Sequence, residues 1–106
     1  MSQLDLLDNA SVDAWLVSHS TWTVANGHLV REIRTTNYPS AVEILGAQVA
    51  LAQRLDHHPL VTVGYNNLRF ELWTHVSGGL TQLDLDYAQA LDELVSTQFS
   101  DVVVTT

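Results

Sequence analysis

Three histidines in this chain could carry acid–base chemistry. His57 and His58 are adjacent, and His75 follows in the same half of the sequence. An imidazole has an ordinary pKa of about 6.5, so it can donate or accept a proton near neutral pH. We therefore predict that these three residues form a catalytic site for proton transfer. The other two, His19 and His28, are expected to be half-buried side chains held by hydrogen bonds.

A predicted β-hairpin would bring the three histidines together. Residues 61–65 and 68–74 have the composition of strands, and the Asn66-Asn67 pair between them favours a two-residue turn. With that turn, one face is wholly apolar through three cross-strand pairs: Tyr65 with Leu68, Val63 with Phe70, and Val61 with Leu72. Continuing the register places Leu60 opposite Trp73. It also places His58 opposite His75 on the face away from the helices, with Cβ atoms about 4.5–5.5 Å apart.

The first part of the chain predicts a helix and another hairpin. The helix is expected near residues 11–18, where apolar residues recur every three to four positions. Strands are predicted over residues 21–25 and 29–34. Asn26-Gly27 joins them, and this pair is typical of a hairpin turn because both residues tolerate positive φ.

Two longer helices are predicted on either side of the second hairpin. One is expected to begin at Pro39-Ser40, with Ser40 and Glu43 as a capping box, and to end near Leu55. The other is expected over residues 82–98 behind an N-cap at Thr81. The valine-rich tail, residues 102–104, is β-prone.

The predicted order of elements is therefore α-β-β-α-β-β-α. This order favours an α+β fold in which a four-stranded antiparallel sheet carries three helices on one face. The sequence has no repeat, low-complexity tract or Pro/Gly-rich linker, so we expect residues 1–106 to form a single domain.

The composition favours a soluble, acidic protein. Twelve acidic residues face four basic ones, giving a net charge of -8, and the four arginines are scattered, so we expect no direct contact with nucleic acid. The chain has no cysteine and therefore no thiol chemistry. We see neither a signal peptide nor a stretch long enough to span a membrane, and we expect a cytoplasmic protein.

A metal site is an alternative use of the same histidines. His57, His58 and His75 together with Asp56 or Asp84 would supply three imidazoles and a carboxylate. Adjacent side chains on a strand diverge, however, so the His57-His58 pair is poorly suited to chelation. We therefore favour proton transfer and expect no metal.

Several spaced motifs around the histidines resemble a known family. They are Asp56-His57-His58-Pro59, Tyr65-Asn66, Thr74-His75, Gly78-Gly79-Leu80-Thr81 and Asp84. This combination is similar to that of the pterin-4a-carbinolamine dehydratases, closely over residues 53–84, and the order of elements extends the similarity over nearly the whole chain. The resemblance implies a cofactor-independent lyase that dehydrates 4a-hydroxytetrahydropterin to quinonoid dihydropterin in pterin recycling. It also implies a pterin substrate. Because the edge strands of a four-stranded sheet offer unpaired backbone that a second subunit could complete, we expect a homodimer or homotetramer.

The same resemblance implies roles for individual residues. His57 and His75 would be the acid–base pair, and His58 would orient the substrate. Trp73 would offer a stacking face for the pterin ring. The remaining residues implied to bind substrate are Asp56, Pro59, Thr74, Val76 and Ser77. Asp84 would orient a histidine or stabilise the first turn of the last helix.

Two positions depart from the family pattern. Gln53 stands where the family usually has an ionisable residue, often glutamate, so it can orient a neighbour but supplies no charge. Leu60-Val61 stands where many members have an acidic residue followed by an aromatic or apolar one. These departures raise a second hypothesis, a non-catalytic binding module that acts as a dimerisation cofactor or an assembly chaperone.

Overall fold

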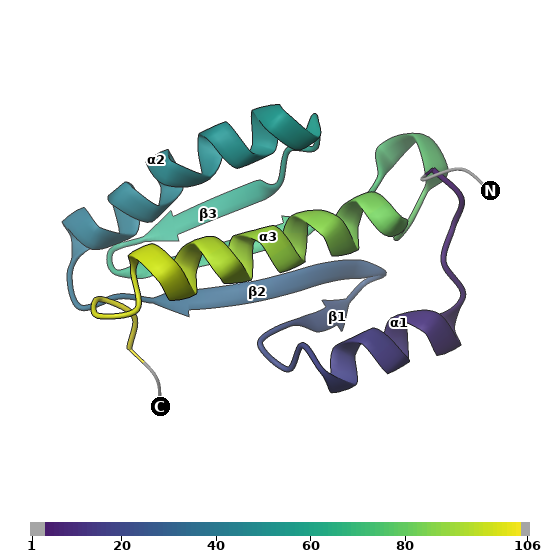
Figure 1. The fold of residues 1–106 in the computed structure, drawn as a ribbon, viewed down its shortest axis with the longest axis horizontal. Helices are drawn as coiled ribbons and strands as arrows, with labels where there is room; N and C mark the ends of the chain where they lie inside the picture. Colours follow the sequence, from purple (N-terminus) through teal and green to yellow (C-terminus); the bar gives the residue numbers. More distant parts are fainter. Residues whose placement is uncertain (1–3, 105–106) are drawn as a thin grey trace.

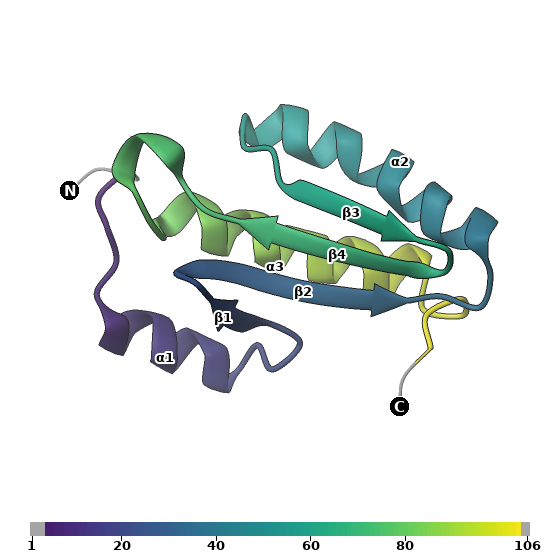
Figure 2. The same ribbon diagram turned by 180° about the vertical axis from the view of Figure 1, so that it is seen from behind.

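The computed structural model describes residues 4–104 and has the predicted order of elements, with one short 3₁₀ helix added. Figures 1 and 2 show the arrangement from its two sides. The strands are β1 (Thr23–Ala25), β2 (His28–Arg34), β3 (Leu60–Gly64) and β4 (Asn67–Leu72). The helices are α1 (Asn9–Val17), α2 (Tyr38–Leu55), η1 (His75–Ser77) and α3 (Gln82–Gln98). The strands form one antiparallel sheet in the order β1-β2-β4-β3, so the predicted fold class is confirmed.

The hydrophobic core lies between the sheet and the two long helices. Along β4, Leu68, Phe70 and Leu72 are buried, while Arg69 and Glu71 between them face the other way. This alternation is the period of two expected of a strand with one covered face. Helices α2 and α3 lie side by side on that face, and α1 lies along β1 at the edge (Figures 1 and 2). The opposite face of the sheet carries no helix (Figure 2).

The first hairpin agrees with the sequence, but two helix starts do not. Asn26 and Gly27 form the predicted turn, with φ of 55° and 75°. The predicted capping box of Ser40 and Glu43 is wrong. The side chain of Asn37 accepts the N–H of Ser40 at 2.9 Å, so α2 begins at Tyr38. Helix α1 also begins earlier than predicted, because the carboxylate of Asp8 caps it.

The second hairpin turns one residue earlier than predicted, so the predicted register of its two strands is wrong. The turn is Tyr65-Asn66, and the ladder runs from Leu60 opposite Glu71 to Gly64 opposite Asn67. Asn66 is held at the end of β2: its amide donates to the carbonyl of Thr35 at 2.9 Å, and its own carbonyl accepts the N–H of Thr35 at 2.8 Å. Tyr65 consequently takes a positive φ of 51° and is 73% exposed instead of facing the core.

This shift leaves the residues of β3 on the sheet faces predicted for them, but it removes the predicted pair of His58 and His75. Because each partner moves by two residues, Val61 and Val63 still face the core, opposite Phe70 and Leu68. The ladder ends at Leu60 and Glu71, before either histidine, so His58 and His75 are not cross-strand partners. Likewise, Leu60 is not opposite Trp73.

The last segments close the ends of the sheet. After β4, a bridge between Thr74 and Gly79 closes the loop that contains η1. The C-terminal tail adds a bridge between Val103 and Thr35 at the end of β2. None of the helices within residues 4–104 is long and apolar enough to cross a lipid bilayer.

Candidate active site

Two loops and the first turn of α3 meet at one end of the sheet and form an open pocket of about 570 Å³. One loop follows α2, and the other follows β4 and includes η1; Leu4, from the segment before α1, completes the lining. The residues that line the pocket are Leu4, Asp56, His57, His58, Trp73, Thr74, His75, Val76 and Leu83. The three predicted histidines therefore share one pocket, although the predicted cross-strand pairing is absent.

The end of α2 positions the first two histidines. Asp56 has a left-handed backbone, with φ of 49° and ψ of 44°, and stops the helix three residues before Pro59. The N–H of His57 then bonds to the carbonyl of Ala52 at 3.1 Å. This helix ending turns the chain back and directs His57 toward the interior.

Asp84 holds His57 through a buried hydrogen bond. The Nε2 of His57 donates to Oδ1 of Asp84 at 2.6 Å, and the aspartate side chain is fully buried. The second oxygen, Oδ2, accepts the Thr74 hydroxyl at 2.9 Å and the backbone N–H of Thr81 at 2.9 Å. A buried carboxylate is tolerated when its acceptor sites are filled in this way.

This hydrogen bond selects one tautomer of His57. With the proton on Nε2 shared with a carboxylate, Nδ1 carries the lone pair. Within residues 4–104, Nδ1 has no hydrogen-bond partner. Every buried side-chain nitrogen or oxygen in these residues does have one, so an atom without a partner must touch solvent. Nδ1 therefore keeps contact with solvent in a residue that lines the pocket.

His58 and His75 are both exposed, in different surroundings. The Nε2 of His58 donates to Oε1 of Gln53 at 2.7 Å. The amide of Gln53 therefore orients His58, whereas the carboxylate beside His57 comes from Asp84. The ring of His75 has no hydrogen bond to the described residues and packs against Trp73, with ring centroids 4.6 Å apart and planes at 48°.

Trp73 also contacts a histidine of β2, on the face of the sheet that carries no helix. The ring of His28, on β2, stacks on Trp73 with centroids 4.0 Å apart and planes at 9°. His28 also bonds through Nδ1 to Glu71, which accepts Arg69 Nη1 at 2.5 Å. The hydrogen bond from His28, followed in size by the one from Arg69, holds the pKa of the Glu71 carboxyl below its ordinary value.

Four of the residues singled out from the sequence do not line the pocket. Gln53 and Asp84 each contact a histidine from behind, and Ser77 donates to the carbonyl of Leu4. Pro59 is half-buried and lies outside the lining. As for the metal alternative, no three His, Asp or Glu residues within 4–104 lie close enough together to hold an ion.

Sequence reasoning missed three residues near the site. Leu83 could have been found, because it precedes Asp84 in the same helical turn. Leu4 carried no signal in the sequence. The contact of His28 with Trp73 depends on β2 pairing with β4, and these strands are not consecutive in the chain.

Comparisons with known proteins agree with the predicted resemblance. The profile of a family described as pterin 4 alpha carbinolamine dehydratase matches residues 5–94. A Chloroflexus aurantiacus protein named "Putative pterin-4-alpha-carbinolamine dehydratase" is 35% identical over 89 residues, which cover 84% of this chain and 96% of that protein. A protein of the same name from Metallosphaera sedula is 41% identical over 83 residues, covering 78% and 86%.

A solved structure shares the fold. It is described as the crystal structure of a transcriptional coactivator/pterin dehydratase from Brucella melitensis, and its chain matches with a TM-score of 0.80 at 23% identity. The match covers 85% of this chain and 98% of that one. From the profile and the two relatives, the chain belongs to the pterin 4α-carbinolamine dehydratase family.

Proposed function

We propose that this protein dehydrates a 4a-hydroxytetrahydropterin to the quinonoid dihydropterin, with His57 and His75 as the acid–base pair and His58 orienting the substrate. The observation that carries the proposal is the pocket itself. Three imidazoles border it, and a buried carboxylate holds one of them in a defined tautomer. The family membership of the chain supports the same reaction.

The reaction needs two proton transfers and no redox step. The C4a–O bond breaks, and the leaving hydroxyl takes a proton and departs as water. The proton on N5 is removed, and its bonding electrons form the C4a=N5 double bond. One group must therefore donate a proton while another accepts one. General acid–base catalysis of this kind contributes roughly 10²- to 10⁴-fold in rate.

His57 is suited to act as the base. Its Nδ1 has a free lone pair and solvent contact, while the Asp84 carboxylate would stabilise the imidazolium formed when Nδ1 takes a proton. His75 is suited to act as the acid, because its exposed ring has no competing hydrogen bond among the described residues. Near neutral pH an imidazole exists in both forms, so each histidine can recover its starting state between turnovers.

The pocket also offers binding groups for a flat, polar ring. Trp73 and Leu83 supply apolar surface, and Thr74, His75 and Val76 of the loop after β4 also line the pocket. Asp56 and His58 line it from the loop that follows α2. Gln53 bonds to His58 and so favours one position of that ring, which fits an orienting role.

A stopped-flow assay of dehydration tests the proposal. We expect the wild type to accelerate the reaction over its spontaneous rate and His75→Ala to lose about 10²-fold in kcat. His19→Ala is the matched control, because His19 stacks on Trp15 in α1 and does not line the pocket. A wild type no faster than the spontaneous reaction would favour the non-catalytic binding module, and a fully active His75→Ala would remove His75 from the mechanism.

We further propose that the protein assembles as a homodimer or homotetramer. Strand β3 is an edge of the sheet, so one side of its backbone has no strand partner within residues 4–104, and Leu60 on it is 53% exposed. Exposed edges of this kind pair readily with a second chain. Light scattering on the purified protein would show a dimer or tetramer mass, and a monomer at micromolar concentration would contradict the proposal.

A further inference from the structure

Three aromatic rings contact one another in succession, beginning outside the pocket; we call them the ring stack, although only its first pair is parallel and its second is tilted. His28 packs parallel to Trp73, and Trp73 in turn packs against His75. Strands β2 and β4 pair up to Leu29 opposite Leu72, and the next pair in that register would be His28 and Trp73. The stack therefore joins a residue of β2 to the proposed general acid.

The ring of His28 is also held by a hydrogen bond to a carboxylate. Its Nδ1 bonds to Glu71, and Arg69 Nη1 donates to the other oxygen of the same carboxylate at 2.5 Å. The side chains of His28 and Glu71 are only 27% and 17% exposed. The ring of His28 is thus fixed on two sides, by an ion-paired carboxylate and by the indole.

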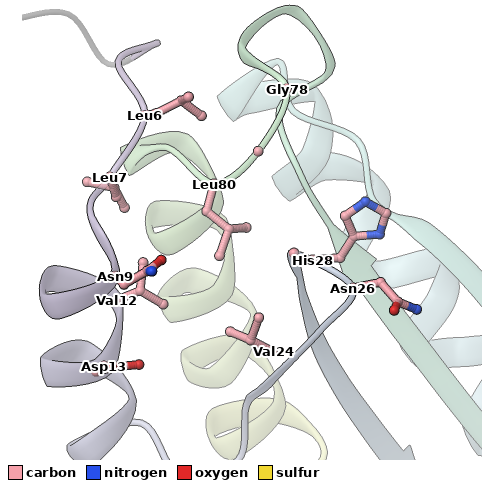
Figure 3. A pocket seen from close by; sticks show the side chains of 12 residues that line it. Leu6, Leu7, Asn9, Val12, Asp13, Val24, Asn26, His28, Gly78 and Leu80 are labelled. Atoms are coloured by element: carbon pink, nitrogen blue, oxygen red, sulfur yellow. The ribbon is translucent and has the colours of Figure 1, made fainter.

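The orientation of the His28 ring is not explained by the second cavity that His28 borders. His28 contributes to the lining of a second pocket of about 320 Å³, between α1, the Asn26-Gly27 turn and Gly78-Gly79. In Figure 3 the imidazole of His28 points away from Leu7 and Leu80, which form the apolar wall of that pocket. The ring is directed toward β4, where Trp73 lies.

The strand order shows from which side His28 reaches Trp73. Strand β4 lies between β2 and β3, and His28 covers the indole face on the β2 side. His57 and His58 immediately precede β3, on the other side of β4. Trp73 and His75 line the pocket and His28 does not, so His28 contacts the indole from outside the pocket.

We propose that His28 is a positioning residue for the site: by stacking on Trp73, it fixes the indole against which His75 and the planar substrate rest. The inference rests on the proposed dehydratase function for its kinetic part, and on the geometry of the ring stack for its structural part. Without His28, the indole can rotate toward the vacated space. His75 would then lose its support, and the stacking surface for the substrate would be less well defined.

The test compares His28→Ala and His28→Phe with Thr62→Ala. Thr62 is exposed on the same helix-free face, on β3, where its cross-strand partner is Arg69 and not one of the three rings. His28→Ala removes the ring, whereas His28→Phe keeps an aromatic face without the hydrogen bond to Glu71. The first readout is the NMR resonance of the His75 imidazole protons, which the ring current of the neighbouring indole shifts. The second is kcat/KM for dehydration.

We expect His28→Ala to move the His75 resonance and to lower kcat/KM about two- to tenfold, the usual effect of losing one aromatic pair. His28→Phe should restore most of both, and Thr62→Ala should leave both at wild-type values. A folded His28→Ala protein with an unchanged His75 resonance would overturn the proposal. A moved resonance with unchanged kcat/KM in an active enzyme would overturn its kinetic part.

The NMR readout keeps this inference separate from the proposed function. If the wild type does not dehydrate the pterin, the His75 resonance alone decides whether His28 positions that ring. If His28→Ala does not fold, Glu71→Gln replaces it, because that change weakens the hold on His28 and keeps all three rings. An unchanged His75 resonance in Glu71→Gln would then count against the proposal.

Discussion

Asp84 has two structural tasks, one for each of its carboxylate oxygens. The sequence offered two readings of this residue, orienting a histidine or stabilising the first turn of α3, and the contacts include both. Oδ1 accepts from His57, and Oδ2 accepts the N–H of Thr81 in the capping box. The capping part could be predicted from residue spacing alone. The contact with His57 could not, because it depends on how the α2 ending packs against α3.

Asp84→Asn should lower kcat by about 10²-fold or more with little change in KM. The Oδ2 position accepts two hydrogen bonds, so the amide oxygen is expected there and the NH₂ group would face His57. Nε2 of His57 must then accept, which moves its proton to Nδ1 and removes the proposed base. Steady-state kinetics check this, with circular dichroism to confirm folding.

Asp86→Asn is the matched control for that change. Asp86 lies on the same helix, and among the described residues its side chain accepts a hydrogen bond only from Gln82 Nε2, at 2.9 Å. Its kinetics should equal those of the wild type. Equal kcat values for Asp84→Asn and Asp86→Asn would show that the carboxylate is not needed to set the tautomer of His57.

At the scale of elements, the ends of helices and turns decide where the site residues lie. The sequence predicted all three α-helices and all four strands, but not η1, and most bounds hold within two or three residues. It misplaced the start of α2 and the turn of the second hairpin. In both cases the deciding contact came from an asparagine: Asn37 capped the helix, and Asn66 bonded to distant Thr35. The second contact joins strands that local patterns cannot pair.

The left-handed residue that ends α2 gives a prediction about stability. Non-glycine residues in this conformation cost roughly 1–2 kcal/mol, and Asp less than most. Asp56→Gly should therefore raise the free energy of unfolding by up to about 1 kcal/mol, whereas Asp56→Val should lower it by about 1–2 kcal/mol. Urea denaturation measures both. Similar values for the two variants would mean that residue 56 does not hold this backbone conformation in solution.

At the scale of the whole molecule, the fold brings two loops and the start of α3 together at one end of the sheet. Composition and element order were enough to predict the α+β architecture, and the spaced motifs indicated the family. The grouping of the histidines was also predicted, but for the wrong reason. They meet because the α2 ending and the loop after β4 converge on α3, and not because they pair across a hairpin. The order β1-β2-β4-β3, which brings His28 to Trp73, could not be derived from one sequence.

The pH dependence of dehydration tests the central claim, histidine acid–base catalysis in this pocket, most directly. If one histidine must be neutral and another protonated, kcat/KM of the wild type should follow a bell-shaped curve between about pH 5 and 8. His75→Ala should lose the limb that reports the acid. An enzyme that accelerates dehydration with a flat profile over that range would contradict the account.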